Sequence, residues 1–299
     1  MADVFQTVDE RERMSGEEFA ELYVKRRRPV LLKRALSGCS ALSRWTLDYL
    51  RRCSGDMIVP LKSWNGAGIA MTHMRFHDYA DQLERYESAM GDRGSNAAER
   101  PAYLHDIPLK SILPEVEAAL EQFPNQYFPI WYRSMWSDFA QFFLGPAGSI
   151  TPLHFDSLLT HNLFFQIVGR KRFVLIPAQQ LKFCYPYKWR WCRVDVEQPD
   201  FDRYPDYRRA HAVEVVLEPG DGLYFPSGTL HHVRSLDLGL SFNVDWHTQE
   251  SAAAGLVAVA RGMPLRNFYY NALIASGLWL GAPAKQVYPY YRSYLDYVS

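Results

Sequence analysis

Side chains of types that bind transition metals occur in two short segments that lie far apart in the sequence. His154 and Asp156 are separated by one residue in ITPLHFDS, and a His-His pair closes the later segment EPGDGLYFPSGTLHHV. In a β-strand, residues two apart point to the same face, so His154 and Asp156 can address one point. Two imidazoles and one carboxylate on one face of a metal are typical of non-haem Fe(II) oxygenases. The two segments therefore predict a metal site.

The later segment offers two adjacent histidines, and neighbouring strand residues point to opposite sides. Alternation alone does not choose between His231 and His232. A turn, a short strand and a second turn precede both, which favours a second strand lying beside the first. The alternative is that all three polar side chains are buried and hydrogen-bonded without any metal.

The segments around these residues predict a β-barrel or sandwich that would position them. From about Trp131 onward, short apolar or alternating runs are separated by Gly, Pro and Asp, as in FAQFFLG, LFFQIVGRKRFVLIP, AVEVVLEPGDGLYFP and LSFNVDW. Helical patterns precede and follow this part. They cover a helix opened by a capping box at Ser15–Glu18, then Thr46–Cys53, Phe76–Tyr86, Ala252–Ala260 and Leu265–Ala275.

Composition indicates a globular protein and argues against several function classes. The chain has 299 residues, 48% of them hydrophobic, and equal numbers of basic and acidic residues, 33 of each. This balance argues against nucleic-acid binding as the main function. The longest apolar stretch, Ala272–Ala284, is shorter than the ~20 residues of a membrane span. The four cysteines show no C-x-x-C pair, which fits a cytoplasmic protein.

Several segments, in the same order, resemble the landmarks of the Jumonji-C hydroxylases. They are PVLLKRAL, WTLDYL, TPLHFD, NLFFQIVGRKRFVLIP, CYPY, VDVEQPDFDRYP, EPGDGLYFPSGTLHHV and SFNVDW. Among these enzymes the chain most resembles the asparaginyl hydroxylase of hypoxia-inducible factor and its relatives. The resemblance extends from about Ser15 to His247.

This resemblance implies a mostly β fold, a double-stranded β-helix (jelly-roll, cupin-like) barrel with N-terminal α/β elements and C-terminal helices. We expect flanking elements over 1–125, the Jumonji-C core over 126–248 and a helical region over 249–299. It also implies Fe(II) as cofactor, 2-oxoglutarate and O₂ as cosubstrates, and His231 as the third ligand, which leaves His232 a packing or supporting role. No catalytic side chain beyond the metal centre is predicted.

The resemblance further assigns residues to 2-oxoglutarate. Lys171 and Thr151 match the lysine and hydroxyl that hold its carboxylate, Asn162 and Asn243 match asparagines near the cosubstrate and the metal, and Tyr103 matches a tyrosine at the far carboxylate. Physically, a lysine turned inward on an otherwise apolar strand face needs an anion. The alternative for Lys171 is a turn lysine that reaches solvent beside Arg170 and Arg172.

One departure from the family pattern lies next to the metal site. The segment DSLLTHN carries two extra residues between Asp156 and Asn162. This insertion puts the substrate surface in doubt more than the metal site. His161 lies within it, and we do not expect it to be a ligand.

The long connection from Phe183 to His211 is rich in aromatic and basic residues. Long loops of this kind often cover sites, so Trp189, Trp191 and Arg190 are candidate substrate contacts. A loop wrapped on the barrel by its own aromatic residues is equally compatible with the sequence.

The function that these features favour is hydroxylation of a peptide or protein side chain. Hydroxylation of a small molecule or of a natural-product peptide, and a cupin-like metal- or ligand-binding protein without turnover, are the alternatives. Histone lysine demethylation is less favoured because the chain lacks zinc-binding cysteine clusters. The apolar C-terminal helices suggest a homodimer.

Overall fold

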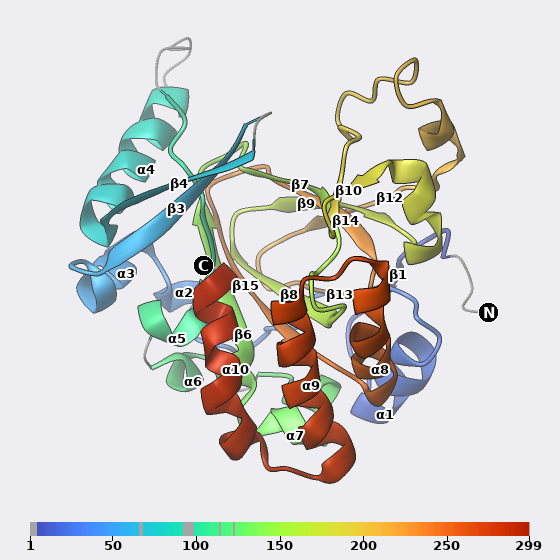
Figure 1. The fold of residues 1–299 in the computed structure, drawn as a ribbon. Helices are drawn as coiled ribbons and strands as arrows, with labels where there is room; N and C mark the ends of the chain where they lie inside the picture. Colours follow the sequence, from blue (N-terminus) through green and yellow to red (C-terminus); the bar gives the residue numbers. More distant parts are fainter. Residues whose placement is uncertain (1–4, 66–67, 92–98, 114, 122, 299) are drawn as a thin grey trace.

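Two β-sheets pack face to face at the centre of the molecule, with helices around them (Figure 1). The computed structural model describes residues 5–65, 68–91, 99–113, 115–121 and 123–298. This is the expected jelly-roll, cupin-like architecture with helical additions.

The larger sheet has seven strands, in the order β1-β2-β13-β8-β15-β6-β5. Its central strands are almost completely buried, because helices cover one face and the second sheet lies on the other. The bounds are β1 Asp9–Arg11, β2 Val30–Leu32, β5 Leu104–Pro108, β6 Ala140–Gly145, β8 His161–Val168, β13 Gly222–Phe225 and β15 Gly239–Trp246.

The smaller sheet has six strands, in the order β10-β11-β7-β14-β9-β12. Its edge strand β12 alternates buried and exposed residues, as expected for a strand with one face in solvent. The bounds are β7 Ile150–His154, β9 Lys171–Ile176, β10 Pro186–Tyr187, β11 Trp191–Cys192, β12 Val213–Leu217 and β14 Leu230–Ser235.

The N-terminal part supplies several helices, and it also contains one hairpin that the sequence did not predict. β3 (Ile58–Asn65) and β4 (Gly68–Arg75) form this separate two-stranded sheet beside the barrel. The helices are α1 Gly16–Phe19, continued by a π-helix Ala20–Val24, then α2 Ala41–Arg44, α3 Leu47–Ser54, α4 Phe76–Gly91, α5 Leu109–Ile112, α6 Val116–Ala119 and α7 Ile130–Arg133. Further 3₁₀ turns cover Asn125–Tyr127 and Trp136–Phe139.

The predicted helix starts are explained by their caps. The Ser15 hydroxyl accepts a hydrogen bond from the Glu18 backbone N–H at 3.0 Å, and the Thr46 hydroxyl accepts one from the Tyr49 N–H at 3.2 Å. α3 ends at Gly55, as expected, and α4 extends five residues beyond the predicted end at Tyr86.

The chain ends in three helices that pack on the barrel and on each other, namely α8 (Gln249–Val257), α9 (Leu265–Leu280) and α10 (Ala284–Val298). A 3₁₀ turn, Ala258–Arg261, follows α8, and further 3₁₀ turns at Ala178–Cys184 and Pro205–Arg209 lie in the smaller sheet's long connection. Within the described part of the chain, no helix is long and apolar enough to cross a membrane.

Candidate metal centre

The predicted metal ligands come together at the end of two adjacent strands. His154 is the last residue of β7, and the strand register places it directly opposite His231 of β14. Asp156 follows just beyond the end of β7, and its Oδ1 lies 3.7 Å from Nε2 of His231. One ligand atom from each of the three residues lies within 4.8 Å of the others. Across the described residues, this is the one group of three metal-binding side chains.

Backbone carbonyls fix the orientation of both imidazoles. Nδ1–H of His154 donates to the Pro152 carbonyl at 2.8 Å, and Nδ1–H of His231 donates to the Thr229 carbonyl at 3.1 Å. Each ring therefore presents Nε2 to the common point, as metal-binding histidines with such partners do. Burial lowers the pKa of both histidines, and their mutual repulsion adds to this for His154. Both are therefore neutral at pH 7, the form in which imidazole binds metals.

His232, the alternative third ligand, points away from this centre. It lies on the outer side of β14, near Glu197 and Arg172, and burial lowers its pKa to about 4. Neighbouring strand residues point to opposite sides, so His231 faces the metal centre and His232 faces away from it.

Lys171 lies inside the barrel and does not reach solvent. It is fully buried at the start of β9, and its Nζ donates to the Tyr103 hydroxyl at 2.9 Å and to the Ser241 hydroxyl at 2.7 Å. The ammonium also lies 4.8 Å from the centre of the Phe164 ring. Burial lowers the pKa of Lys171 to about 7. A cation in this position needs an anionic partner to offset its desolvation.

Thr151 and Tyr103 line the same cavity as the metal ligands. The Thr151 hydroxyl lies 3.1 Å from Nε2 of His105, and Tyr103 comes from the segment that pairs with β3. The cavity thus extends from the three metal ligands to Tyr103, whose hydroxyl accepts a hydrogen bond from Lys171. A diacid that bridges a metal and a lysine fits this order of groups.

Both predicted asparagines also line this cavity. The Asn162 amide donates to Oδ2 of Asp156 at 3.2 Å and so orients that carboxylate. The Asn243 amide donates to Asp245 at 2.9 Å and makes no contact with a metal ligand. Asn162 therefore lies beside the predicted metal ligand Asp156, and Asn243 lies beside another carboxylate, that of Asp245.

The two-residue insertion forms the turn between β7 and β8. Leu159 adopts a left-handed backbone conformation with φ of 61°, and its carbonyl accepts a hydrogen bond from Ser227 at 2.5 Å. The Thr160 hydroxyl donates to Asp245 at 3.4 Å. Nδ1 of His161 lies 2.8 Å from the Tyr224 hydroxyl, inside the core and away from the metal ligands.

The connection from Phe183 to His211 lies at the mouth of this cavity. The Trp191 ring lies 5.0 Å from the His154 ring, and the Arg190 guanidinium stacks on Trp191 at 4.6 Å. Arg190 also lines the cavity itself. Trp189 donates from its indole N–H to the Ser157 carbonyl at 2.8 Å. Farther along, Tyr185 packs on Tyr204, so this connection both contacts the mouth and wraps on itself.

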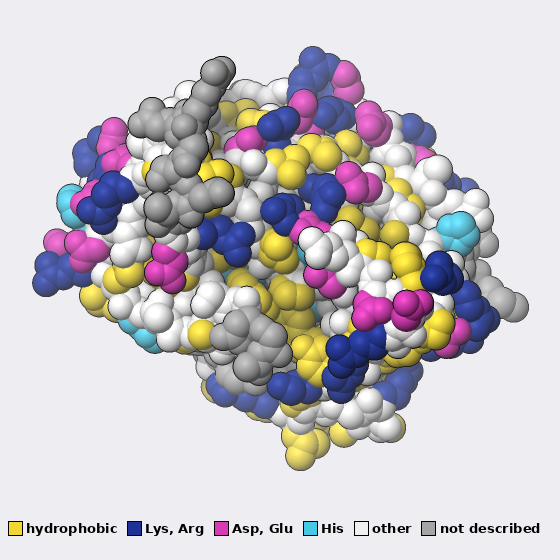
Figure 2. Space-filling model, turned by 90° about the horizontal axis from the view of Figure 1, so that it is seen from above, with side chains coloured by type: hydrophobic (Ala, Val, Ile, Leu, Met, Phe, Trp, Pro, Cys, Tyr) yellow, Lys and Arg dark blue, Asp and Glu magenta, His cyan; other side chains and the backbone are white. Residues whose placement is uncertain are grey.

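A surface groove of about 460 Å³ leads outward from the cavity, and His105 and Arg190 line both. The groove runs between the β3–β4 hairpin and the Phe183–His211 connection, with Trp64 on one side and Trp189 and Trp191 on the other. Figure 2 shows the molecule from above, with basic side chains near the middle of this face and hydrophobic side chains between them.

Sequence reasoning missed several residues that line the cavity, namely His105, Asp106, Gln141, Asp245 and Tyr294. Asp245 lies two residues after Asn243 on β15, and strand alternation predicts that both face the same side. His105 and Asp106 follow Tyr103 closely. Tyr294 comes from α10, and no sequence pattern indicates that this helix reaches the cavity.

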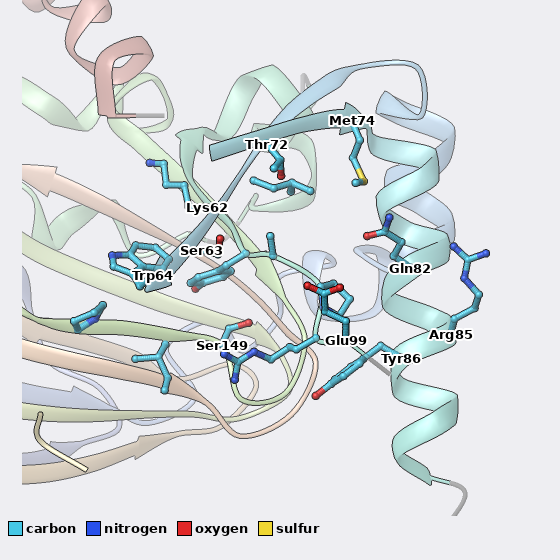
Figure 3. Close-up of a pocket in the computed structure, with 17 residues that line it drawn as sticks. Lys62, Ser63, Trp64, Thr72, Met74, Gln82, Arg85, Tyr86, Glu99 and Ser149 are labelled. Carbon is cyan, nitrogen blue, oxygen red and sulfur yellow. The ribbon is translucent and has the colours of Figure 1, made fainter. Parts of the chain in front are cut away.

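A larger cavity of about 700 Å³ lies between the β3–β4 hairpin and α4 (Figure 3). The figure shows Gln82 and Tyr86 of α4 on one side and Trp64 and Ser149 on the other. Tyr103 lines both this cavity and the one that holds the metal ligands.

Comparison with known proteins gives matches over most of the chain. A family model described as the cupin-like domain matches residues 16–252. Lysine-specific demethylase 8 of Xenopus tropicalis is 27% identical over 236 residues, which cover 78% of this chain and 51% of that protein. Jumonji C domain-containing protein 5 of Drosophila melanogaster is 27% identical over 237 residues, which cover 78% of this chain and 58% of that protein.

A relative with a different name matches a similar share of the chain. The tRNA wybutosine-synthesizing protein 5 of Gallus gallus is 25% identical over 245 residues, which cover 78% of this chain and 74% of that protein. The chain spans little more than half the length of the demethylase and of the Drosophila protein.

The donor groups at the two parts of the cavity fit the expected cofactor and cosubstrate. Two neutral imidazoles and one carboxylate suit Fe(II) and leave coordination positions open. The buried Lys171 and its hydroxyl neighbours suit one carboxylate of 2-oxoglutarate.

Proposed function

The chain belongs to the cupin-like family of Jumonji-C domains, and on that premise we propose that it is an Fe(II)- and 2-oxoglutarate-dependent oxygenase that hydroxylates a side chain of a peptide or protein. The convergence of His154, Asp156 and His231 on one point carries the proposal, because the same cavity is lined by Tyr103, whose hydroxyl accepts a hydrogen bond from the buried Lys171. When bound, the iron and 2-oxoglutarate supply the oxidation chemistry.

The protein's own residues have three tasks in this proposal. The Pro152 and Thr229 carbonyls hold the two imidazoles in the tautomer that offers Nε2 to the metal. Lys171, Tyr103 and Thr151 bind and orient the diacid, and Asn162 holds the Asp156 carboxylate. Phe164, Phe173 and Phe225 line the cavity and exclude water from the reacting atoms.

Formation of succinate from 2-oxoglutarate tests the proposal directly. We expect it to depend on added Fe(II) and on oxygen, and to fall below detection in His154→Ala and Asp156→Ala. Circular dichroism and thermal unfolding would show that both variants remain folded. Iron-independent succinate formation, or full activity in both variants, would overturn the proposal.

Demethylation is a second candidate because one of the matched relatives is named a lysine-specific demethylase. Hydroxylation of an N-methyl group releases formaldehyde, whereas hydroxylation of a carbon leaves one added oxygen on the product. Formaldehyde detection and mass spectrometry on the same reaction therefore separate the two. Our proposal expects a gain of one oxygen without formaldehyde.

The finer alternatives from the sequence remain proposals with their own readouts. A likeness to the asparaginyl hydroxylase of hypoxia-inducible factor predicts an oxidised asparagine in the product. A small-molecule or natural-product peptide hydroxylase would turn over free metabolites or small peptides without a protein substrate. A cupin-like binding protein would bind Fe(II) and 2-oxoglutarate but form no succinate with any peptide pool.

Trp189, Trp191 and Arg190 belong to the proposed substrate wall at the mouth of the cavity. Arg190 lines the cavity, and both tryptophans line the adjoining groove. We expect Trp189→Ala together with Trp191→Ala to raise the KM for substrate while the KM for 2-oxoglutarate changes little. An unchanged substrate KM would remove these residues from the wall.

We also propose that the C-terminal helices pair with a second copy of the chain. Leu265 and Leu280 of α9 are 74% and 82% exposed, and Phe268 and Trp279 are partly exposed on the same helix. Light scattering should give twice the 34.6 kDa of one chain, and Leu265→Glu with Leu280→Glu should return the monomer mass. A monomer mass for the unaltered chain at high concentration would contradict this proposal.

A further inference from the structure

Asp156 differs from the other two predicted metal ligands because it lies outside regular secondary structure. His154 ends β7 and His231 lies in β14, and each imidazole is held by a carbonyl two residues earlier in the chain. Asp156 follows the end of β7, and a turn begins at the next residue, Ser157. The position of the Asp156 carboxylate therefore depends on contacts that lie outside the two strands.

Three side chains from distant parts of the chain converge on Ser157. The Tyr294 hydroxyl of α10 lies 3.0 Å from the Ser157 hydroxyl, and the Asn267 amide of α9 donates to the Ser157 carbonyl at 3.3 Å. The Trp189 indole donates to the same carbonyl at 2.8 Å. The three residues lie 137, 110 and 32 positions away from Ser157 in the sequence. Tertiary contacts therefore fix both the hydroxyl and the carbonyl of Ser157.

The contacts at Ser157 are shielded from solvent. Ser157, Asn267 and Tyr294 are 7%, 3% and 6% exposed. Burial raises the pKa of Tyr294, so its hydroxyl keeps its proton, and either hydroxyl of the pair can donate. Water does not replace a hydrogen bond between buried groups, so the loss of one partner leaves the other unpaired at a cost. This cost holds the turn after Asp156 in one position.

Tyr294 connects this turn to the metal cavity. Its side chain lines the cavity together with Asp156, although it comes from α10. α10 packs on α9, and the Tyr294 ring lies 5.2 Å from the Tyr270 ring of α9 (Figure 1). Both helices thus contact the turn that follows Asp156, and α10 also supplies part of the cavity wall.

The other supports of Asp156 are local in the sequence. Asn162 donates to its Oδ2 at 3.2 Å, and the Leu159 N–H donates to its carbonyl at 2.9 Å. The more distant of these two residues is six positions away. The contacts at Ser157 differ, because they tie the same segment to α9, to α10 and to the Phe183–His211 connection.

We propose that Ser157 is a positioning residue for the metal ligand Asp156, and that α9 and α10 act on the metal centre through it, by way of Asn267 and Tyr294. This inference rests on the proposed function, because it requires that Asp156 binds the metal. Groups that hold metal ligands in place contribute about 10–100-fold to metal affinity. Without its contacts at Ser157 the turn relaxes, and the carboxylate occupies the binding position for less of the time.

The test is Co(II) binding to the protein without 2-oxoglutarate. Co(II) accepts the same donor groups as Fe(II), and its visible absorption depends on the ligand geometry. Ser157→Ala and Tyr294→Phe each remove one hydroxyl of the pair, and Asn267→Leu removes the donor to the Ser157 carbonyl. We expect each variant to weaken Co(II) binding by about tenfold and to change the visible spectrum of the bound ion.

The double variant Ser157→Ala with Tyr294→Phe isolates the contact between the two hydroxyls. Because both substitutions remove the same hydrogen bond, the double variant should lose no more Co(II) affinity than either single variant. Two independent effects would instead multiply to a loss of about 100-fold, and that result would contradict a role through this contact.

Tyr270→Phe is the matched control. The Tyr270 hydroxyl of α9 lies 2.9 Å from the Ser293 hydroxyl of α10, so this variant also loses a hydrogen bond of the C-terminal helices. It should lower the melting temperature about as much as Tyr294→Phe does, because each variant loses one hydrogen bond of similar length. Its Co(II) affinity and spectrum should stay those of the unaltered protein.

Two further outcomes would overturn the inference. One is an unchanged Co(II) affinity and spectrum in Ser157→Ala and Tyr294→Phe, which would make the contact purely structural. The other is an equal loss of affinity in Tyr270→Phe, which would indicate a general loosening of the helices. Because neither oxygen nor 2-oxoglutarate is used, a lack of iron-dependent succinate formation would remove the proposed oxygenase activity without altering this binding result.

Discussion

The two ends of the metal cavity are built in opposite ways. At the inner end, Lys171 is fully buried, donates two hydrogen bonds of 2.7 and 2.9 Å and lies close to the Phe164 ring. At the outer end, Asp106 and Asp245 form no ion pair with a basic side chain among the residues that the structure describes. The inner end is thus a fixed cation held by neutral groups, whereas the outer end carries two acidic side chains, of which Asp245 accepts hydrogen bonds from Asn243 and Thr160.

This difference between the two ends matches the difference between the cosubstrate, which is the same in every reaction, and the substrate, which varies. A preorganised cation with its hydroxyl neighbours already in place suits a cosubstrate that is the same in every reaction cycle. An outer end without a fixed cation suits the component that differs between reactions, the substrate. The metal ligands lie between the two ends.

Removing a metal ligand, which lies between the two ends of the cavity, should have the largest effect, a loss of Fe(II) affinity. Loss of His154 or Asp156 to alanine should weaken Fe(II) binding by more than about 100-fold, because even partners of metal ligands contribute 10–100-fold. Iron retained after anaerobic gel filtration measures this. His232→Ala is the matched control, since this residue of the same strand points outward, and it should keep its iron. Equal iron loss in all variants would show that the metal lies elsewhere.

Removing the inner cation should have the next largest effect. Lys171→Met should raise the KM for 2-oxoglutarate by about 30-fold or more, because truncating one partner of a buried charge pair costs 2–5 kcal/mol. The Fe(II) affinity should change little. Arg172→Met, the outward neighbour that pairs with Glu197 at 2.7 Å, should leave this KM near its original value. A similar KM for 2-oxoglutarate in both variants would show that Lys171 does not bind this cosubstrate.

The pH dependence of the KM for 2-oxoglutarate should reflect the protonation of Lys171. Burial lowers the pKa of Lys171 to about 7, so the free protein loses this charge as the pH rises above 7. A bound dianion favours the charged form, so the KM for 2-oxoglutarate should rise up to about tenfold per pH unit above pH 7. Tyr103, the neighbouring titratable group, stays neutral because burial raises its pKa.

The window for this measurement is pH 7 to 9, where His154 and His231 are already neutral because burial lowers their pKa values. The stability of the ligand-free protein should change in the same range. The unfolded lysine keeps its proton up to its ordinary pKa of about 10.4, so the unfolded state binds more protons and stability rises with pH. Lys171→Met should remove the pH dependence of both the KM for 2-oxoglutarate and the free energy of unfolding in this range. A KM that does not vary with pH in the unaltered protein would contradict this prediction.

The smallest effect concerns the mouth of the cavity. Trp189→Phe keeps the ring that packs against Phe155 but removes the indole N–H that donates to the Ser157 carbonyl. We expect a loss of about 1 kcal/mol in the free energy of unfolding, typical of one hydrogen bond. Thermal unfolding measures it, and an unchanged 2-oxoglutarate KM should accompany it. A large change in that KM would mean that the mouth and the inner end are coupled.

The part of the site that lies on regular strands could be predicted from the sequence. His154 and Lys171 lie on strands, Asp156 follows two residues after His154 just beyond the end of β7, and the turn before His231 placed that strand beside the first. The choice between His231 and His232 needed the structure or the family pattern. Alternation also extends to Asp245, which shares a face with Asn243, although the sequence alone did not draw attention to it.

The rest depends on features that local patterns do not encode. Asp106 faces the cavity because β5 bulges where it pairs with β6, and bulges depend on the partner strand. Tyr294 reaches the cavity from α10, through tertiary packing of the C-terminal helices. The β3–β4 hairpin that borders the outer groove was missed, and its second strand, β4, is exposed along most of its length and so lacks the apolar alternation of a half-buried strand.

The most direct measurement of the central claim is an anaerobic crystal structure with Fe(II) and 2-oxoglutarate, with iron located by its anomalous scattering. The account predicts one iron bound by Nε2 of His154, a carboxylate oxygen of Asp156 and Nε2 of His231. It also predicts the far carboxylate of the diacid on Nζ of Lys171. Iron bound elsewhere, or a diacid that leaves Lys171 without an anion, would contradict it.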